Sequence, residues 1–199
     1  MADTPTLPDF TAVDVELANA KFGSVCSIAL AKVRHGQIVD ARHRLCVPAP
    51  PLNFFGRRQM QLHGIGPVDL RGALPFAEAY RRMCRFVGDD PLVAHGTNDR
   101  AMLGQSCECS GVSMADHDFI DTVAISRAVL PDLADHKLPT LAAHLGVELV
   151  THHNALADAR ACAEIFLALG SPDRRVRRSY RYGGGGPPSV YGTDLRTAA

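Results

Sequence analysis

Three apolar segments rich in β-branched residues occupy the N-terminal part of the chain, at positions 10–15, 25–33 and 38–47. The second and third segments are separated by residues 34–37, a turn-like break of hairpin length. Short apolar segments of this kind are typical of strands, and short connections favour pairing between neighbours. The pattern therefore predicts an antiparallel meander of three strands at the start of the fold.

The hydrophobic period becomes helical further along the chain. Within residues 75–87, one helical face collects Phe76, Ala79, Tyr80, Met83 and Val87. Further helices are predicted at 99–105, 122–130, 138–145 and 153–169, and short buried strands at 91–94 and 119–121. Strands followed by strand–helix alternation predict a mixed sheet covered by helices, which is an α/β domain.

Composition and length favour one globular domain over residues 1–170. The chain has 199 residues, of which 46% are hydrophobic and 21% charged, as is ordinary for a globular protein. No apolar stretch approaches the roughly 20 residues of a membrane span, and the first residues lack the basic-then-apolar pattern of a secretory signal. We therefore expect a cytoplasmic protein that does not enter a membrane.

Residues 171–199 have a different composition, dominated by Arg, Gly and Pro. They carry six arginines and two aspartates, whereas residues 1–170 carry 15 basic and 19 acidic side chains. The zero net charge of the whole chain thus combines an acidic body with a basic tail. Without apolar periodicity, this segment buries too little surface to offset its ordering entropy, so we predict a flexible tail.

The six cysteines are scattered through apolar segments rather than arranged as a disulfide framework. We expect them to be reduced thiols. Cys107 and Cys109 form half of a metal clip, but no second Cys/His pair at zinc spacing follows. A zinc site made of these two cysteines and His117 is an alternative that the sequence leaves open.

Two carboxylates, Asp14 and Glu16, end the first predicted strand. Residues two apart on a strand project to the same side, so both acids share one space while Val13 and Val15 face the other. Adjacent carboxylates repel each other and lose hydration, and a cation between them offsets that cost. On these residues alone, a solvated acidic strand end remains the alternative.

Three further polar residues stand in apolar surroundings. Asp158 lies between alanines, whose small side chains allow another element to approach closely, and His153 precedes it by five residues. Asp99 follows the strand predicted at 91–94 and opens a helix. Each residue alone also fits a simpler role, because acids are common on helix surfaces and at helix starts and His153 lies beside a good cap, Asn154.

Together, the four acids and the histidine resemble the ordered motifs of the DEDDh family of 3′–5′ exonucleases, the DnaQ-like group that includes proofreading subunits and ribonuclease T. The opening FTAVDVELANAKFGSVCSIAL resembles the first motif, and LHGI at 62–65 is similar to an Ile-His-Gly-Ile segment of the family. LVAHGTNDRAML resembles the second motif, and DFIDTVAISRAVLP resembles an Asp-Thr strand and helix. KLPTLAAHLGVEL and HHNALADARACAEI resemble the third motif, so the resemblance covers residues 9–169 in order.

This resemblance implies an α/β, ribonuclease-H-like fold with a mixed five-stranded sheet flanked by helices. It implies two divalent cations, Mg²⁺ or Mn²⁺, which hard oxygen ligands suit, and it identifies their ligands as Asp14, Glu16, Asp99 and Asp158. His153 is the implied general base, because the family spacing is His-x-x-x-x-Asp; the neighbouring His152 is its rival.

The implied substrate is the 3′ end of single-stranded or frayed DNA or RNA, hydrolysed to nucleoside 5′-monophosphates. Leu17, at the position after the motif-one acid, is a candidate contact to the terminal nucleotide. Phe54, His63 and Ile65 are candidates for stacking on or wedging a terminal base. The tail arginines are candidates for contact with a phosphate backbone, or for docking to a polymerase or another replication protein. The sequence leaves open whether the protein forms a homodimer.

The second motif differs from the family pattern. Family members usually have His-Asn-Ala-x-Phe-Asp, whereas His95-Gly96-Thr97-Asn98-Asp99 is one residue shorter and lacks both the Asn and the Phe. A small displacement at a catalytic site lowers the rate strongly. The alternative function is therefore a catalytically weakened exonuclease fold that binds nucleic acid or assists a polymerase.

Overall fold

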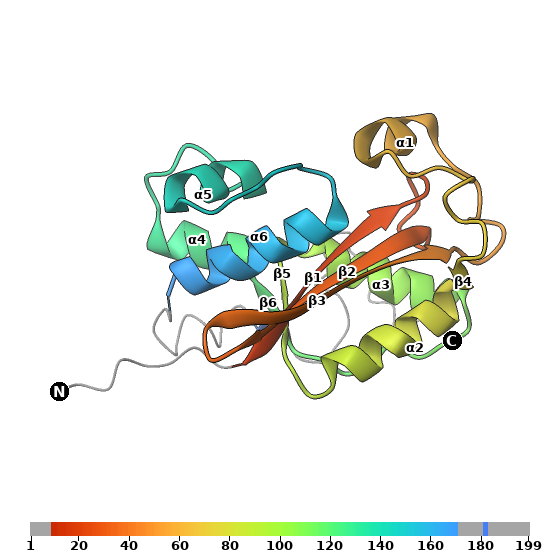
Figure 1. Ribbon diagram of the computed structural model, residues 1–199, viewed down its shortest axis with the longest axis horizontal. Helices are drawn as coiled ribbons and strands as arrows, with labels where there is room; N and C mark the ends of the chain where they lie inside the picture. Colours follow the sequence, from red (N-terminus) through yellow and green to blue (C-terminus); the bar gives the residue numbers. More distant parts are fainter. Residues whose placement is uncertain (1–8, 171–180, 183–199) are drawn as a thin grey trace.

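A seven-stranded sheet in the order β4-β3-β2-β1-β5-β6-β7 forms the centre of the protein. The structure is a computed structural model that describes residues 9–170 and 181–182 (Figure 1). The N-terminal strands β1 (Phe10–Leu17), β2 (Val25–Arg34) and β3 (Gln37–Val47) pair antiparallel with their neighbours. The predicted meander is therefore confirmed.

Four shorter strands complete the sheet. Strands β5 (Leu92–Ala94) and β6 (Phe119–Asp121) add in parallel beside β1, so all five predicted strands are present. Two-residue strands lie at the edges: β4 (Leu74–Pro75) pairs with β3, and β7 (Arg181–Tyr182) pairs with β6. Strand β7 falls within the predicted tail, and the rest of that tail lies outside the described residues.

The described part of the chain contains six helices. They are α1 (Arg57–His63), α2 (Phe76–Val87), α3 (Asn98–Cys109), α4 (Thr122–Val129), α5 (Leu138–Leu145) and α6 (Ala155–Ala168). Helix α1 was not predicted, because none of its residues is buried and it has no apolar stripe. Helix α3 extends beyond the predicted residue 105, and α5 ends at Gly146 in the expected left-handed conformation, with φ 70°.

The two faces of the sheet are covered by different helices, α4, α5 and α6 on one side and α2 and α3 on the other (Figure 1). Alternate residues of β1 divide between these layers, because successive side chains of a strand point to opposite faces. Phe10 and Ala12 pack in the α6 layer, and Val13 and Val15 pack under α2 and α3. This alternation directs the side chains of Asp14 and Glu16 toward α6.

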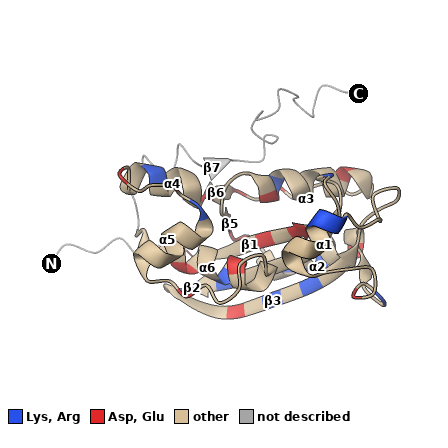
Figure 2. Ribbon diagram, turned by 90° about the horizontal axis from the view of Figure 1, so that it is seen from above, with Lys and Arg blue, Asp and Glu red and all other residues tan. Residues whose placement is uncertain are grey.

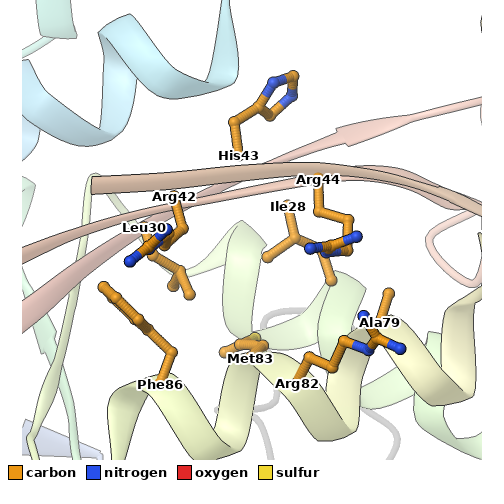
Figure 3. Close-up of a pocket in the computed structure, with 9 residues that line it drawn as sticks. All are labelled: Ile28, Leu30, Arg42, His43, Arg44, Ala79, Arg82, Met83 and Phe86. Atoms are coloured by element: carbon orange, nitrogen blue, oxygen red, sulfur yellow. The ribbon is translucent and has the colours of Figure 1, made fainter. Parts of the chain in front are cut away.

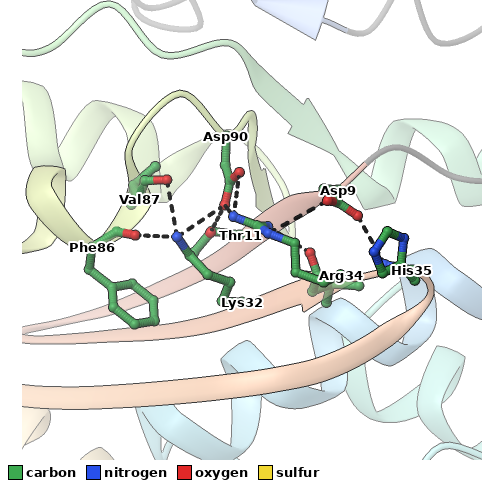
Figure 4. A network of polar contacts seen from close by, with 9 residues as sticks. Asp9, Thr11, Lys32, Arg34, His35, Phe86, Val87 and Asp90 are labelled. Carbon is green, nitrogen blue, oxygen red and sulfur yellow. Dashed lines mark hydrogen bonds and ion pairs between the residues drawn. The ribbon is translucent and has the colours of Figure 1, made fainter.

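A polar network connects the start of β1 and the end of β2 to the loop after α2 (Figure 4). Asp90 accepts a hydrogen bond from Thr11 (2.6 Å) and forms ion pairs with Arg34 (2.9 Å) and Lys32 (3.5 Å). Lys32 also donates to the Phe86 carbonyl at the end of α2. Hydrogen bonds between charged groups are stronger than neutral ones, so this network fixes α2 against the sheet.

The structure also bears on the expectations about the cysteines, a zinc site and a membrane span. All six cysteines are free thiols, as predicted. In the described part of the chain, Cys107, Cys109 and His117 do not form a group of metal-ligating atoms, which removes the basis for a zinc site there. None of the described helices has the length and apolar character needed to cross a membrane.

Candidate active site

Three of the predicted ligands meet between β1 and α6. Carboxylate oxygens of Asp14, Glu16 and Asp158 all lie within 4.8 Å of one another, and Figure 2 shows acidic residues in both elements. Glu16 is 8% exposed and Asp158 is 4% exposed. None of the described lysine or arginine side chains forms an ion pair with these carboxylates.

Small residues allow α6 to bring Asp158 this close to the sheet. Ala155 and Ala159, one turn apart on α6, pack against Ala29 of β2, which pairs with Asp14 of β1. Larger side chains at these positions would hold the helix further from the strands. The helix begins where Asn154 accepts a hydrogen bond from the backbone N–H of Ala157 (3.1 Å), an N-cap that places Asp158 in the first turn.

Asp99 joins the other acids from the start of α3. Its carboxylate accepts the backbone N–H of Val15 at 3.1 Å, which places it beside the strand that carries Asp14. Strand β5 ends at Ala94, so β1 continues past it and leaves the Val15 N–H without a strand partner. Asp99 lies outside the group formed by the other three carboxylates, but its charge acts on Asp14.

Asp121 supports the shortened turn that leads to Asp99, a role that the sequence did not reveal. Its carboxylate accepts the backbone N–H groups of Gly96 (3.0 Å) and Val123 (2.8 Å). Gly96 has φ 98°, a conformation that residues with a Cβ adopt only with strain. One carboxylate at the end of β6 thus caps α4 and holds the β5–α3 turn.

Burial and the proximity of other carboxylates raise the pKa values of Asp14, Glu16 and Asp99. Burial is the main cause for Asp14, and the charges of Asp99, Glu16 and Asp158 add to it. Burial and the charges of Asp158 and Asp99 raise the pKa of Glu16 to about 8. Burial raises the pKa of Asp99 to about 7, although its hydrogen bond from Val15 lowers it. The ionised cluster is therefore unfavourable without a compensating cation.

Divalent cations fit this donor set. All four side chains offer hard oxygen atoms, which suit Mg²⁺ or Mn²⁺ better than softer metals. Glu16, Asp99 and Asp158 are buried and Asp14 is half-buried. Their charges repel one another, and none of them forms an ion pair with a described lysine or arginine. The residues present are thus those that a site for divalent cations requires, and Asp14, Glu16 and Asp158 would be its central ligands.

His152 and His153 lie directly beside Asp158. The His152 Nδ1 atom is 3.1 Å from the Asp158 carboxylate, which also accepts the backbone N–H of His153 (2.9 Å). Their rings stack with centroids 3.8 Å apart. Within the described part of the chain, no hydrogen bond is made by the ring nitrogens of His153. Burial and the neighbouring His152 lower the pKa of His153, which keeps its ring neutral and able to accept a proton.

The predicted substrate contacts lie at the end of β1 (Leu17), at the end of α1 (His63) and in the loops on either side of α1 (Phe54 and Ile65). Both ring nitrogens of His63 are engaged, one with the Leu17 carbonyl and one with the backbone N–H of Ile65, each at 3.0 Å. His63 thus links the end of β1 to the loop that follows α1. Phe54 is 55% exposed, and its carbonyl accepts a hydrogen bond from Asn19 (2.9 Å).

Comparison with known proteins is consistent with this geometry. The family model described as RNase T, exonuclease, matches residues 10–166. The PolC-type DNA polymerase III of Halalkalibacterium halodurans is 31% identical over 160 residues, which are 79% of this chain and 11% of that polymerase. The corresponding protein of Oceanobacillus iheyensis is 31% identical over 163 residues, with coverage of 80% and 11%. The chain thus spans about a tenth of the length of these relatives.

Solved structures share the fold at lower sequence identity. The nuclease domain of 3′hExo, a DEDDh family member bound to rAMP, aligns with a TM-score of 0.69 and 16% identity over 83% of this chain and 92% of that one. Exonuclease X in complex with 5′ overhanging duplex DNA aligns with a TM-score of 0.65 and 19% identity over 80% and 90%. These likenesses confirm the ribonuclease-H-like fold, and the match over residues 10–166 shows that the chain belongs to the RNase T exonuclease family.

Proposed function

We propose that this exonuclease uses two divalent cations to hydrolyse phosphodiester bonds at the 3′ end of single-stranded or frayed nucleic acid. The proposal rests on the proximity of three side chains, Asp14, Glu16 and Asp158, whose carboxylate oxygens lie within 4.8 Å of one another. Asp99, bonded to the strand between the first two acids, completes the ligand set. Nucleoside 5′-monophosphates are the proposed products.

Cations bound by these four acids would activate the attacking water and stabilise the departing 3′ oxygen. His153 takes the proton of that water as general base, because its neutral ring is the free acceptor next to Asp158. His152 holds the Asp158 carboxylate through Nδ1 and so orients a ligand rather than the water. Leu17, Phe54, His63 and Ile65 line the space for the terminal nucleotide.

The relatives support the proposed substrate and partner in less detail. Exonuclease X is described in complex with DNA and exonuclease I with a dA16 oligonucleotide, which supports a nucleic-acid strand as the substrate. The relatives with similar sequences are DNA polymerases III, which supports a polymerase as partner. Docking of that partner through residues 171–199 stays a prediction, because most of this segment lies outside the described residues.

A time course on single-stranded DNA and RNA labelled at the 5′ end tests this function. With Mg²⁺ or Mn²⁺, we expect a ladder of products shortened one nucleotide at a time from the 3′ end, and with EDTA an intact strand. A 3′-labelled strand should release its label at once as a mononucleotide. Internal cleavage, or a strand left intact with both metals, would refute the proposal.

A further inference from the structure

A groove between β3 and α2 gathers arginine side chains above an apolar floor (Figure 3). Its volume is about 400 Å³. Arg42 and Arg44 reach it from β3 and Arg82 from α2, and Leu30 and Met83 belong to the floor. These floor residues pack in the α2 layer, so the groove lies on the sheet face opposite to the catalytic acids.

The groove carries an excess of positive charge. Arg42 pairs with Asp40 (2.9 Å) and Arg82 pairs with Glu78 (3.0 Å), whereas Arg44 forms no ion pair with the described acidic residues. At one end, the Lys32 Nζ atom lies 4.8 Å from the centre of the Phe86 ring, and Lys32 is paired with Asp90 (3.5 Å). Three of these four cations are thus paired with a carboxylate, and Arg44 supplies the positive charge that has no ion pair with a described acidic residue. Residues 1–170 as a whole carry more acidic than basic side chains, so an excess of positive charge is unusual in this part of the chain.

Three arginines line this groove and only two of them are paired with carboxylates, an arrangement that favours an anionic ligand. Arginine binds phosphate through two parallel hydrogen bonds, a geometry that lysine does not offer. The groove is also accessible, because β3 is paired with β2 along one edge and with β4 only at Cys46 and Val47. Along the rest of the β4-side edge of β3, no described strand pairs with β3, so the groove is open at that side.

We propose that this groove is a second nucleic-acid site, which binds the phosphate backbone of a strand away from the catalytic acids. The proposal rests on the proposed function, because it takes the ligand class from it. His43 lies between Arg42 and Arg44 on β3 and points to the opposite face (Figure 3), in the cross-strand row of Asp14 and Ala29. Two strand spacings, about 10 Å, separate the backbones of His43 and Asp14.

The two sites therefore lie on opposite faces near one open edge. A strand that occupies both must pass around β3, which only a long strand can do. Short strands reach the acids alone, so the groove should affect affinity for long strands and leave the cleavage of short ones unchanged.

The experiment measures binding of single strands of about 20 and about 3 nucleotides by fluorescence anisotropy in EDTA, at several salt concentrations. It uses the full chain and the double variant Arg42→Gln/Arg44→Gln. The matched control is Arg81→Gln/Arg85→Gln, which removes two exposed arginines of α2 that line a different hollow, near Gly111 and Ala115.

We expect the β3 variant to bind the long strand about tenfold more weakly at low salt, with a salt slope smaller by about 1.4, since each single-strand phosphate contact contributes about 0.7. The control should change affinity less than about twofold, and cleavage of the short strand should stay at the wild-type rate in both variants.

An unchanged salt slope in the β3 variant, or an equal loss in the control, would overturn the proposal and leave an acidic protein segment as the occupant to test. A selective loss of binding in the β3 variant, with no cleavage of any strand by the wild type, would support the groove while the proposed function fails. The two hypotheses are thus separable.

Discussion

Asp14 and Glu16 alternate along β1 with Val13 and Val15, whose side chains point to the other face of the sheet. One strand therefore contributes both to the core and to the site. This division follows from the two-residue period of a strand. The sequence was sufficient to predict it, because the apolar and acidic positions alternate in FTAVDVEL. The contact between His152 and Asp158 was beyond prediction, because it depends on the loop conformation that stacks the two histidine rings.

His153 and His152 should differ in their contribution to catalysis. We expect His153→Gln to lower kcat by about 10²–10⁴, the usual contribution of a general base. His152→Gln should cost about tenfold, because it removes only a group that orients Asp158. Steady-state kinetics with Mn²⁺ would measure both, and a larger loss in the His152 variant would reverse the assignment.

At the scale of elements, the β5–α3 turn decides whether Asp99 reaches the other acids. The turn is one residue shorter than the family pattern, yet Asp99 still bonds to the backbone of Val15. Asp121 compensates by holding Gly96 from the neighbouring strand. Such a contact between β6 and the turn is tertiary, and no local pattern in the sequence predicts it.

Replacing Asp121 tests this account of the turn. Asp121→Ala leaves two backbone N–H groups without their acceptor and removes the cap of α4, so we expect it to lower the free energy of unfolding by about 1–3 kcal/mol. Cleavage should fall as well, because Asp99 is displaced. Asp121→Asn retains an acceptor oxygen and should keep most of the stability. Chemical denaturation and cleavage rates would check this, and a fully active Ala variant would contradict it.

The sequence predicted the long elements and also the short strands β5 and β6 and the helix α5, but it missed α1 and the two-residue strands β4 and β7. Strands β1 to β3 and helix α2 have enough apolar positions to reveal their period, and the structure confirms them. Helix α1 buries none of its residues, and two-residue strands such as β4 have no period at all. These elements are positioned by their neighbours, so their existence depends on packing rather than on local pattern.

For the whole molecule, the buried acids link stability to pH. The pKa values of Glu16 and Asp99 are raised to about 8 and about 7, whereas unfolded carboxyl groups titrate near about 4. Between these values the two carboxyl groups bind more protons in the metal-free folded state than in the unfolded state, so their contribution makes the free energy of unfolding fall as pH rises.

Thermal denaturation of the metal-free protein at about pH 5 and about pH 8.5 would measure this linkage. We expect the lower Tm at the higher pH, and an increase in Tm at that pH when Mn²⁺ or Mg²⁺ is added, since a ligand that binds only the folded state stabilises it. The pH account would be wrong if the metal-free protein were equally stable at both pH values.

Cleavage of a 5′-labelled single strand by Asp14→Asn protein tests the central claim most directly. The substitution removes one charge from the buried cluster with little change in shape, so the variant should remain folded, with a Tm equal to or above that of the metal-free wild type. We expect its cleavage rate to fall by about 10²–10³-fold or more. A folded Asp14→Asn variant that cleaves within about tenfold of the wild-type rate would show that these acids do not form the active site.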